Sequence, residues 1–112
     1  MNIFHKGRGK MRRLKNYKEE LIERLKDPEY ASAYLKACLD ESFETNDIGV
    51  FQLAVRYVVE AHGGMTAISS KMEVSRESFY RSLSEKVKPK FYTLVNAIKA
   101  CGLELDFHPT SS

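Results

Sequence analysis

Apolar residues recur at helical spacing through most of the chain. Between Phe51 and Val59 they fall at positions i, i+3, i+4, i+7 and i+8, which form one continuous face of an α-helix. Similar patterns cover 17–26, 28–43 and 91–98. Residues that begin or end helices separate these segments: Asp27-Pro28, Asp47, Gly63-Gly64, Pro89 and Gly102. The pattern predicts a mostly α protein with about five helices.

The same spacing predicts which side chains face the core. Besides the face over 51–59, the inward residues expected are Ala31, Tyr34, Leu35, Cys38, Leu39, Ser42, Phe91, Leu94, Val95 and Ile98. After Gly102 the period changes, because apolar and acidic residues alternate in the run Leu-Glu-Leu-Asp-Phe at 103–107. This alternation predicts a short C-terminal strand. Such a strand closes its own domain, pairs with a second copy or joins the sheet of a partner, and the pattern does not choose among these.

Residues 65–83 carry the pattern of two short helices that share one core. A helix over 65–72 is followed by a turn at 73–74, and Ser75 then occupies the N-cap position of a second helix over 76–83. The residues expected to join the two helices are apolar Ile68, Met72, Val74, Phe79 and Leu83, with small Ser69 where the helices cross. This spacing predicts a helix-turn-helix, in which the shared core lets the second helix present a polar face outward.

The outward face of the second helix has the chemistry of DNA reading. Arginine pairs with guanine and glutamate accepts hydrogen bonds from cytosine, while hydroxyls and lysines near helix ends bind phosphates. The predicted DNA-binding residues are Thr66, Lys71, Ser75, Arg76, Glu77, Ser78, Tyr80, Arg81, Lys86 and Lys88. The alternative interpretation is an ordinary amphipathic helix pair with a charged face toward solvent.

Charge is unevenly distributed along the 112 residues. The net charge is +3 overall, with +6 over residues 1–26, −5 over 27–64 and +2 over 65–112. Basic ends around an acidic middle indicate two surfaces, one for a polyanion and one for a basic partner. Residues 1–16 lack apolar periodicity and contain Gly7 and Gly9 among basic residues, which predicts a flexible basic arm.

Several classes of function lack support in the sequence. Paired carboxylates, a glycine-rich phosphate loop and metal-ligand spacing are all missing, so we expect no enzyme, no cofactor and no metal site. Cys38 and Cys101 lie on apolar helical faces, as buried free thiols do. No apolar run approaches the roughly 18 residues of a membrane span, and the basic N-terminus has no apolar block behind it. We therefore expect a cytoplasmic protein without membrane contact.

Three motifs carry a resemblance to a known family: LKDPEYASAYLKACLDES at 25–42, FQLAVRYVVEAHGGM at 51–65 and SRESFYRSLSEK at 75–86. On these motifs the chain from Tyr17 onward resembles the probable addiction-module antidote proteins, Hig-like antitoxins of bacterial type II toxin–antitoxin pairs. The run GGMTAISSKMEVSRESFYRSLSEKVKPKFYTLVNAIKACGLEL also resembles the DNA-binding domain of phage-repressor-type (XRE/Cro) proteins. Glu73 departs from the glycine usual at that turn, so either a non-glycine residue adopts positive φ, at a cost on the order of 1 kcal/mol, or the turn differs.

The resemblance implies a fold and a function. The fold is a five-helix phage-repressor-like helix-turn-helix domain at 47–112, preceded by an N-terminal helical extension at 17–46 that contacts a toxin or a second copy. The function is that of a DNA-binding antitoxin that neutralises a RelE/ParE-type toxin and represses its own operon, usually as a homodimer. The expected partner-binding residues are Tyr30, Tyr34, Leu35, Leu39, Asp40 and Glu41, although core packing is the alternative for the aromatic and apolar ones. A stand-alone XRE-family regulator without a toxin partner is the second hypothesis, and an interaction module that no longer reads DNA is the third.

Overall fold

The computed structural model describes residues 10–84 and 88–110, with the backbone alone for 10–15. Its helices are α1 (Lys10–Arg24), α2 (Pro28–Thr45), α3 (Gly49–Ala61), α4 (Gly64–Met72), α5 (Arg76–Ser82) and α6 (Phe91–Ala100). The prediction of a mostly α protein is confirmed, whereas the count of five helices is wrong, because the described residues form six. None of these six has both the length and the apolar character needed to span a bilayer.

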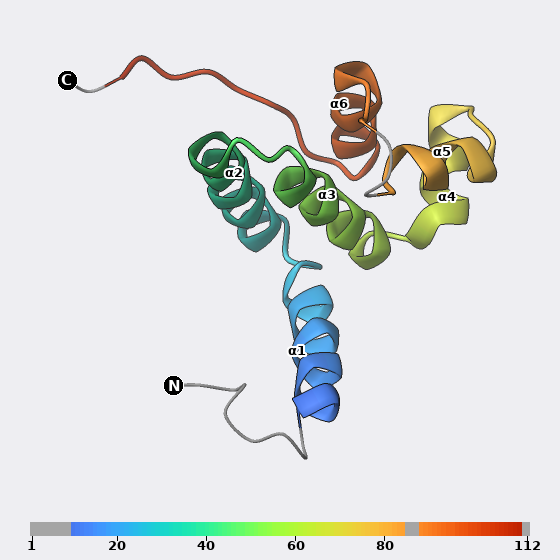
Figure 1. Ribbon diagram of the computed structural model, residues 1–112. Helices are drawn as coiled ribbons and strands as arrows, with labels where there is room; N and C mark the ends of the chain where they lie inside the picture. The colour runs from blue at the N-terminus through green and yellow to red at the C-terminus, as the bar shows by residue number, and fades with distance from the viewer. Residues whose placement is uncertain (1–9, 85–87, 111–112) are drawn as a thin grey trace.

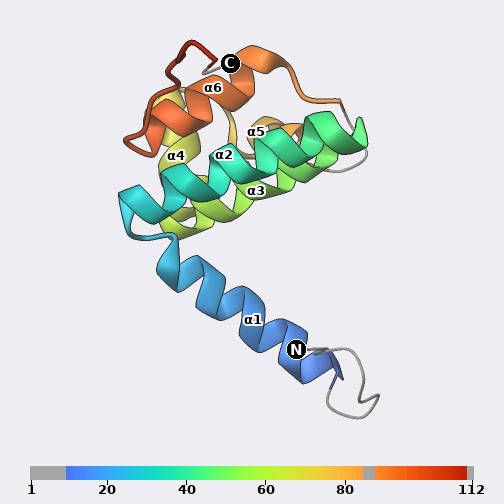
Figure 2. The same cartoon turned by 90° about the vertical axis from the view of Figure 1, so that its left-hand side faces the viewer.

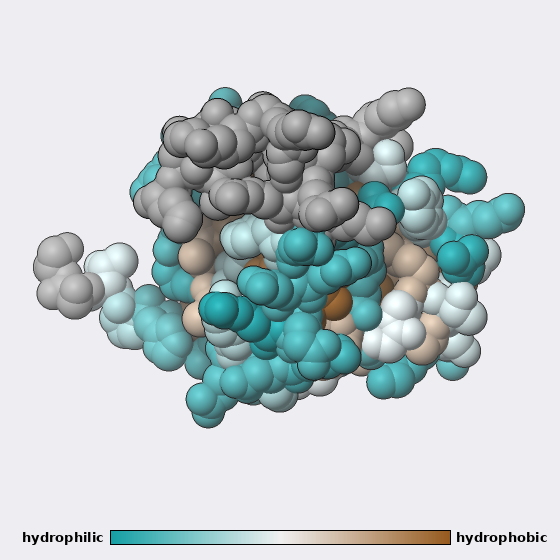
Figure 3. All heavy atoms as spheres, turned by 90° about the horizontal axis from the view of Figure 1, so that it is seen from below, coloured by the Kyte–Doolittle hydropathy of each residue, from teal (hydrophilic) through white to brown (hydrophobic). Residues whose placement is uncertain are grey.

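Helices α2 and α3 lie side by side and form the centre of the molecule (Figure 1, Figure 2). Helix α6 packs against α3 and α4, and the short α4–α5 pair lies at one end. Helix α1 contacts α3 and projects away from the other helices. Seen from below, the described surface is mostly hydrophilic, with apolar residues in small patches (Figure 3).

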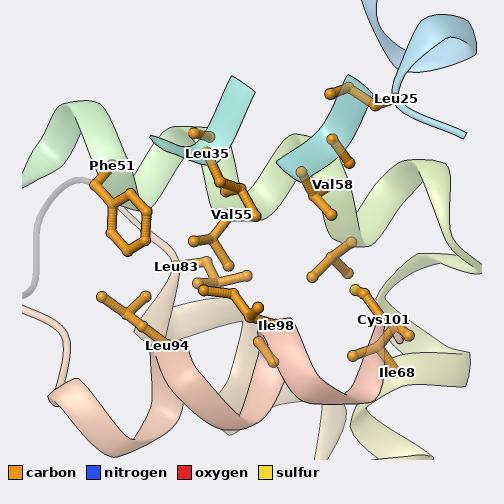
Figure 4. Close-up of a cluster of buried hydrophobic side chains, with 14 of the residues drawn as sticks. Leu25, Leu35, Phe51, Val55, Val58, Ile68, Leu83, Leu94, Ile98 and Cys101 are labelled. Carbon is orange, nitrogen blue, oxygen red and sulfur yellow. The ribbon is translucent and has the colours of Figure 1, made fainter. Parts of the chain in front are cut away.

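The core lies between α3 and the helices that surround it. Every residue of the predicted α3 face is buried, so that prediction is confirmed: Phe51, Ala54, Val55, Val58 and Val59. Of these, Phe51 and Val55 face Leu94 and Ile98 of α6, with Leu83 between the two layers (Figure 4). From the predicted α2 face, Ala31, Leu35 and Ser42 are buried and Tyr34, Cys38 and Leu39 are partly buried.

Phe91 departs from the predicted inward face of α6, because 69% of its surface is exposed. Helix α6 begins at Phe91, and its buried face starts one turn later at Leu94. The first turn therefore extends beyond the edge of the core, where a residue at helical spacing has nothing to pack against. Val95 is partly buried.

Helix ends follow the predicted signals in most places. The Asp27 side chain accepts a hydrogen bond from the Glu29 amide at 3.0 Å, with Pro28 at the first helical position, so α2 begins as predicted. Asp47 was expected to cap α3, but the N-cap is Ile48, which makes no side-chain cap bond; Asp47 instead accepts from the Gly49 amide at 2.9 Å from one residue earlier. Helix α2 ends at Thr45, and its C-cap Asn46 takes the left-handed conformation at φ 56°.

Helix α1 begins earlier than the periodicity predicted. It starts at Lys10 instead of Tyr17, so residues 10–16, expected in the arm, are helical, while residues 1–9 lie outside the described part of the chain. Lysine, arginine, methionine and leucine in this stretch are all good helix formers, which outweighs the absence of an apolar stripe. Leu25 fixes the C-terminal end of α1. Its side chain is buried, and its carbonyl accepts a hydrogen bond from His62 Nε2 at 2.7 Å.

The predicted C-terminal strand is wrong. Residues 103–110 form neither helix nor strand, and the described residues contain no strand with which they could pair. A strand requires a ladder of hydrogen bonds to a neighbour, and an alternating sequence alone does not supply one. The segment instead runs from the end of α6 past α2 (Figure 1).

Candidate functional site

Helices α4 and α5 are joined by the three residues 73–75. Glu73 adopts the left-handed conformation at φ 60°, which confirms positive φ at a non-glycine residue in this turn. The Ser75 side chain accepts a hydrogen bond from the Ser78 amide at 3.1 Å, which confirms Ser75 as the N-cap of α5. The turn is therefore closed by backbone and cap bonds that set the direction of α5.

The two helices share a small apolar core. Ile68, Phe79 and Leu83 are fully buried, and Met72 is partly buried. Val74 was predicted to join them but is 43% exposed, because the left-handed residue before it turns the chain outward. Ser69 is buried where the helices meet, and its hydroxyl donates to a backbone carbonyl of its own helix.

The outer face of α5 gathers most of the predicted DNA-binding residues. Arg76, Glu77, Ser78, Tyr80 and Arg81 are all exposed. A shallow hollow in the surface is lined by Arg76, Glu77, Tyr80 and Arg81, together with Ser84. Within the described residues, neither Arg76 nor Arg81 forms an ion pair. Two guanidinium groups on one helix face are thus available to an anionic partner.

Tyr80 is held by a residue that sequence reasoning missed. Arg56 of α3 donates from Nη2 to the Tyr80 hydroxyl at 3.1 Å, and its guanidinium carbon lies 4.8 Å from the centre of the Tyr80 ring. Arg56 also forms an ion pair with Glu60 of the same helix, whose Oε2 atom lies 3.6 Å from Arg56 Nε. In the sequence, Arg56 stands out only as the single basic residue of α3. No local pattern links it to a tyrosine 24 positions away.

Gln52 is a second residue that the sequence did not reveal. It is 2% exposed, and its Nε2 atom donates to the carbonyls of Ser82 and Ser84 at 2.8 and 2.7 Å. These carbonyls lie at the end of α5, where helical partners run out. Gln52 therefore ties the end of α5 to the beginning of α3.

The predicted phosphate-binding residues are more scattered. Thr66 is exposed in the first turn of α4, and Lys88 is exposed just before α6. Lys71 lies near Cys101 at the end of α6. Burial raises the pKa of the Cys101 thiol to about 11, and the positive charge of Lys71 lowers this pKa in part. Lys86 lies outside the described residues.

The predicted partner-binding residues lie along α2. Tyr30, Asp40 and Glu41 are exposed, and Asp40 accepts from Lys36 Nζ at 2.7 Å. Leu35 is buried in the core. Leu39 and Tyr34 are partly buried. The pKa of Tyr34 is raised above its usual range, mainly by burial and to a smaller extent by the neighbouring Cys38. The accessible part of this surface is therefore mainly acidic.

Comparison with known protein families matches residues 15–109 to the family described as probable addiction module antidote protein. The match covers most of the chain, and the chain belongs to this family. Comparisons with curated proteins and with solved structures gave no significant match. Membership assigns the chain an antitoxin role in an addiction module, and with it a toxin partner of some kind.

Proposed function

We propose that this member of the addiction-module antidote family is a Hig-like antitoxin with an XRE-type helix-turn-helix. In this proposal it neutralises a RelE/ParE-type toxin, binds double-stranded DNA at its own operator and represses its own operon as a homodimer. It acts by binding, without catalysis. The observation that carries the DNA-binding part is the exposed face of α5, where Arg76 and Arg81 form no ion pair with any described residue.

The geometry supports α5 as the reading helix. Its first residues follow a capped turn, and in helix-turn-helix proteins the beginning of the second helix enters the major groove. Arg76 and Glu77 lie in that first turn, whereas Arg81 lies one turn further along. Because Arg56 holds Tyr80, we assign Tyr80 to the edge of the reading surface and the two arginines to base or phosphate contacts.

The acidic side of α2 supports the toxin-binding part. Toxins that act on ribosomes or RNA are basic, because they bind a polyanion. Asp40 and Glu41 are exposed on α2, so they would attract such a toxin at long range and compete with its RNA. Tyr30, at 38% exposure, offers an aromatic contact in the same helix.

Growth of cells that express the small open reading frame beside this gene tests the toxin-binding part. We expect growth arrest when that frame is expressed alone and recovery when this protein is co-expressed. A harmless neighbour would contradict the antitoxin proposal and favour a stand-alone regulator.

Binding to the duplex directly upstream of the gene tests the DNA-binding part. A dimer that neutralises 6–10 phosphates loses roughly 10³–10⁵ in affinity between 50 and 200 mM salt. Arg81→Ala should weaken specific binding by about 1–3 kcal/mol. Lys99→Ala, an exposed change in the last turn of α6, is the matched control for loss of one positive charge. Equal binding by parent and Arg81→Ala would remove Arg81 from the site.

A further inference from the structure

A groove of about 230 Å³ lies between α2 and the segment that follows α6. Apolar side chains line much of it, among them Leu35 and Leu39 of α2, Phe51 of α3 and Leu103 after α6. Residues 103–107 form its second wall. Because Phe107 is 88% exposed, this apolar region continues beyond the groove onto the surface.

Three backbone amides of this wall have no acceptor among residues 10–84 and 88–110. The Leu103 amide donates to the Ile98 carbonyl at 3.1 Å, and the Phe107 amide bonds to the carboxylate of Asp106 at 2.8 Å. Between them, the amides of residues 104–106 donate to no group within the described chain. A segment without helical structure and with free amides can act as the edge of a sheet that lacks its neighbouring strand.

We infer that residues 103–107 and the groove beside them bind an extended, basic strand of a partner protein. The partner strand pairs with the backbone of residues 104–106 and inserts an apolar side chain between this segment and α2, which is recognition by strand addition. The inference rests on the proposed function, in which that partner is the toxin.

Charge selects a basic occupant. Glu104 and Asp106 are exposed on the segment, and Nε2 of His108 lies 3.6 Å from Oδ2 of Asp106. Asp40 is exposed on the opposite wall, where its carboxylate engages Lys36, the one Lys or Arg among the described residues that line the groove. Residues directly opposite in paired strands interact, and opposite charges stabilise the pair. Lysine or arginine on the partner strand would therefore face the acidic side chains of this segment.

The same charges disfavour a second copy of this chain as the occupant. An antiparallel pair of two such segments centred on Leu105 sets Glu104 of each copy opposite Asp106 of the other. Like charges directly opposite are destabilising. A shift by one residue avoids this, but it turns the apolar side chains of one copy to the wrong face.

Charge reversal tests the inference on the purified protein encoded beside this gene. In Glu104→Lys with Asp106→Lys, we expect the dissociation constant to rise about tenfold or more at low salt, with a smaller effect at high salt. Glu73→Lys with Glu77→Lys is the matched control, because it makes the same charge change at the α4–α5 turn. The control should bind that protein like the parent.

Backbone pairing has a separate test in Glu104→Pro compared with Glu104→Gln. Both variants remove the charge, but only proline removes the amide hydrogen. The proline variant should bind roughly threefold to tenfold more weakly than the glutamine variant, the equivalent of one hydrogen bond. Residue 104 is exposed, so urea unfolding of the two variants should coincide.

The outcomes separate the possible occupants. Parent-like binding by both the charge-reversed and the proline variant would overturn the inference and leave the segment as a cover for its own groove. A change of oligomeric state in sedimentation, without a change in binding to the neighbouring protein, would assign the edge to a second copy and also overturn it. If the parent itself fails to bind the neighbouring protein, the proposed toxin partnership fails, and this inference fails with it.

Discussion

Glu73 after α4 and Cys101 after α6 show how local conformation and burial act on single side chains. Glu73 takes a left-handed conformation that glycine adopts at little cost, and its own amide closes the end of α4. Cys101 is buried at the end of α6, so its thiol sits where a charge is poorly solvated. Each feature leads to a measurable effect on stability.

Replacing Glu73 with glycine should stabilise the protein by up to about 1 kcal/mol. Glycine removes the strain of positive φ, although part of the gain is lost to the greater freedom of the unfolded chain. Urea unfolding measures the change. Glu77→Gly inside α5 is the control and should destabilise by roughly 1 kcal/mol, because its backbone is already helical. A loss of stability in Glu73→Gly would show that the Glu73 side chain itself stabilises the turn.

The buried thiol of Cys101 makes the free energy of unfolding depend on pH in the alkaline range. Burial raises the pKa of its thiol from 9.0 to about 11, so the folded state holds the proton more tightly than the unfolded chain does. This contribution is complete below pH 9 and is lost as pH rises toward 11. Relative to Cys101→Ala, the parent should therefore lose free energy of unfolding as the pH rises from 8 to 11, because only the parent carries this thiol. A constant difference over that range would contradict the raised pKa.

At the scale of elements, α3 is the support on which α5 is fixed. Its apolar face forms the core, whereas Gln52 and Arg56 reach α5 with polar groups. Gln52 binds the end of α5, and Arg56 holds the outer-face residue Tyr80. The orientation of α5 therefore depends on polar contacts as well as on burial of Phe79.

Local signals in the sequence predicted most of the helices, whereas contacts between elements did not appear in it. The caps at Asp27 and Ser75 depend on neighbours within a few residues, which a sequence displays directly. The bonds of Gln52 to residues 82 and 84 span about 30 positions, and no local pattern encodes them. The segment 103–107 alternates like a strand, but strand formation depends on a partner elsewhere in the chain or outside it.

Gln52→Leu tests the bond between α3 and α5. Leucine has a similar size but leaves the carbonyls of Ser82 and Ser84 without the Nε2 donor, which should cost about 1–3 kcal/mol. Chemical denaturation measures this loss. Asn96→Leu, at an exposed position of α6, is the control and should stay within about 0.5 kcal/mol of the parent. Unchanged stability in Gln52→Leu would mean that water replaces the lost donor at no cost.

At the scale of the whole molecule, the acidic and the arginine-bearing surfaces lie on different elements. Helix α2 packs mainly against α3, and α5 packs against α4 at the other end of the helices (Figure 1). Asp40 and Glu41 thus lie on a helix that packs against α3, whereas Arg76 and Arg81 lie on a helix that packs against α4. The two partners in the proposed function, a basic protein and DNA, are thus assigned to different helices.

If the proposed function holds, this separation predicts variants that lose binding to the neighbouring protein or to the operator and keep the other. Asp40→Lys with Glu41→Lys should slow association with the neighbouring protein about tenfold at low salt, because it removes long-range attraction, and should leave operator binding by α5 intact. Arg81→Ala should weaken operator binding by about 1–3 kcal/mol and still rescue growth. Surface plasmon resonance against the toxin and against the upstream duplex measures both in parallel. If either variant loses both activities while its unfolding curve matches the parent, the two surfaces are coupled, and toxin and operator binding then act through one shared state of the protein.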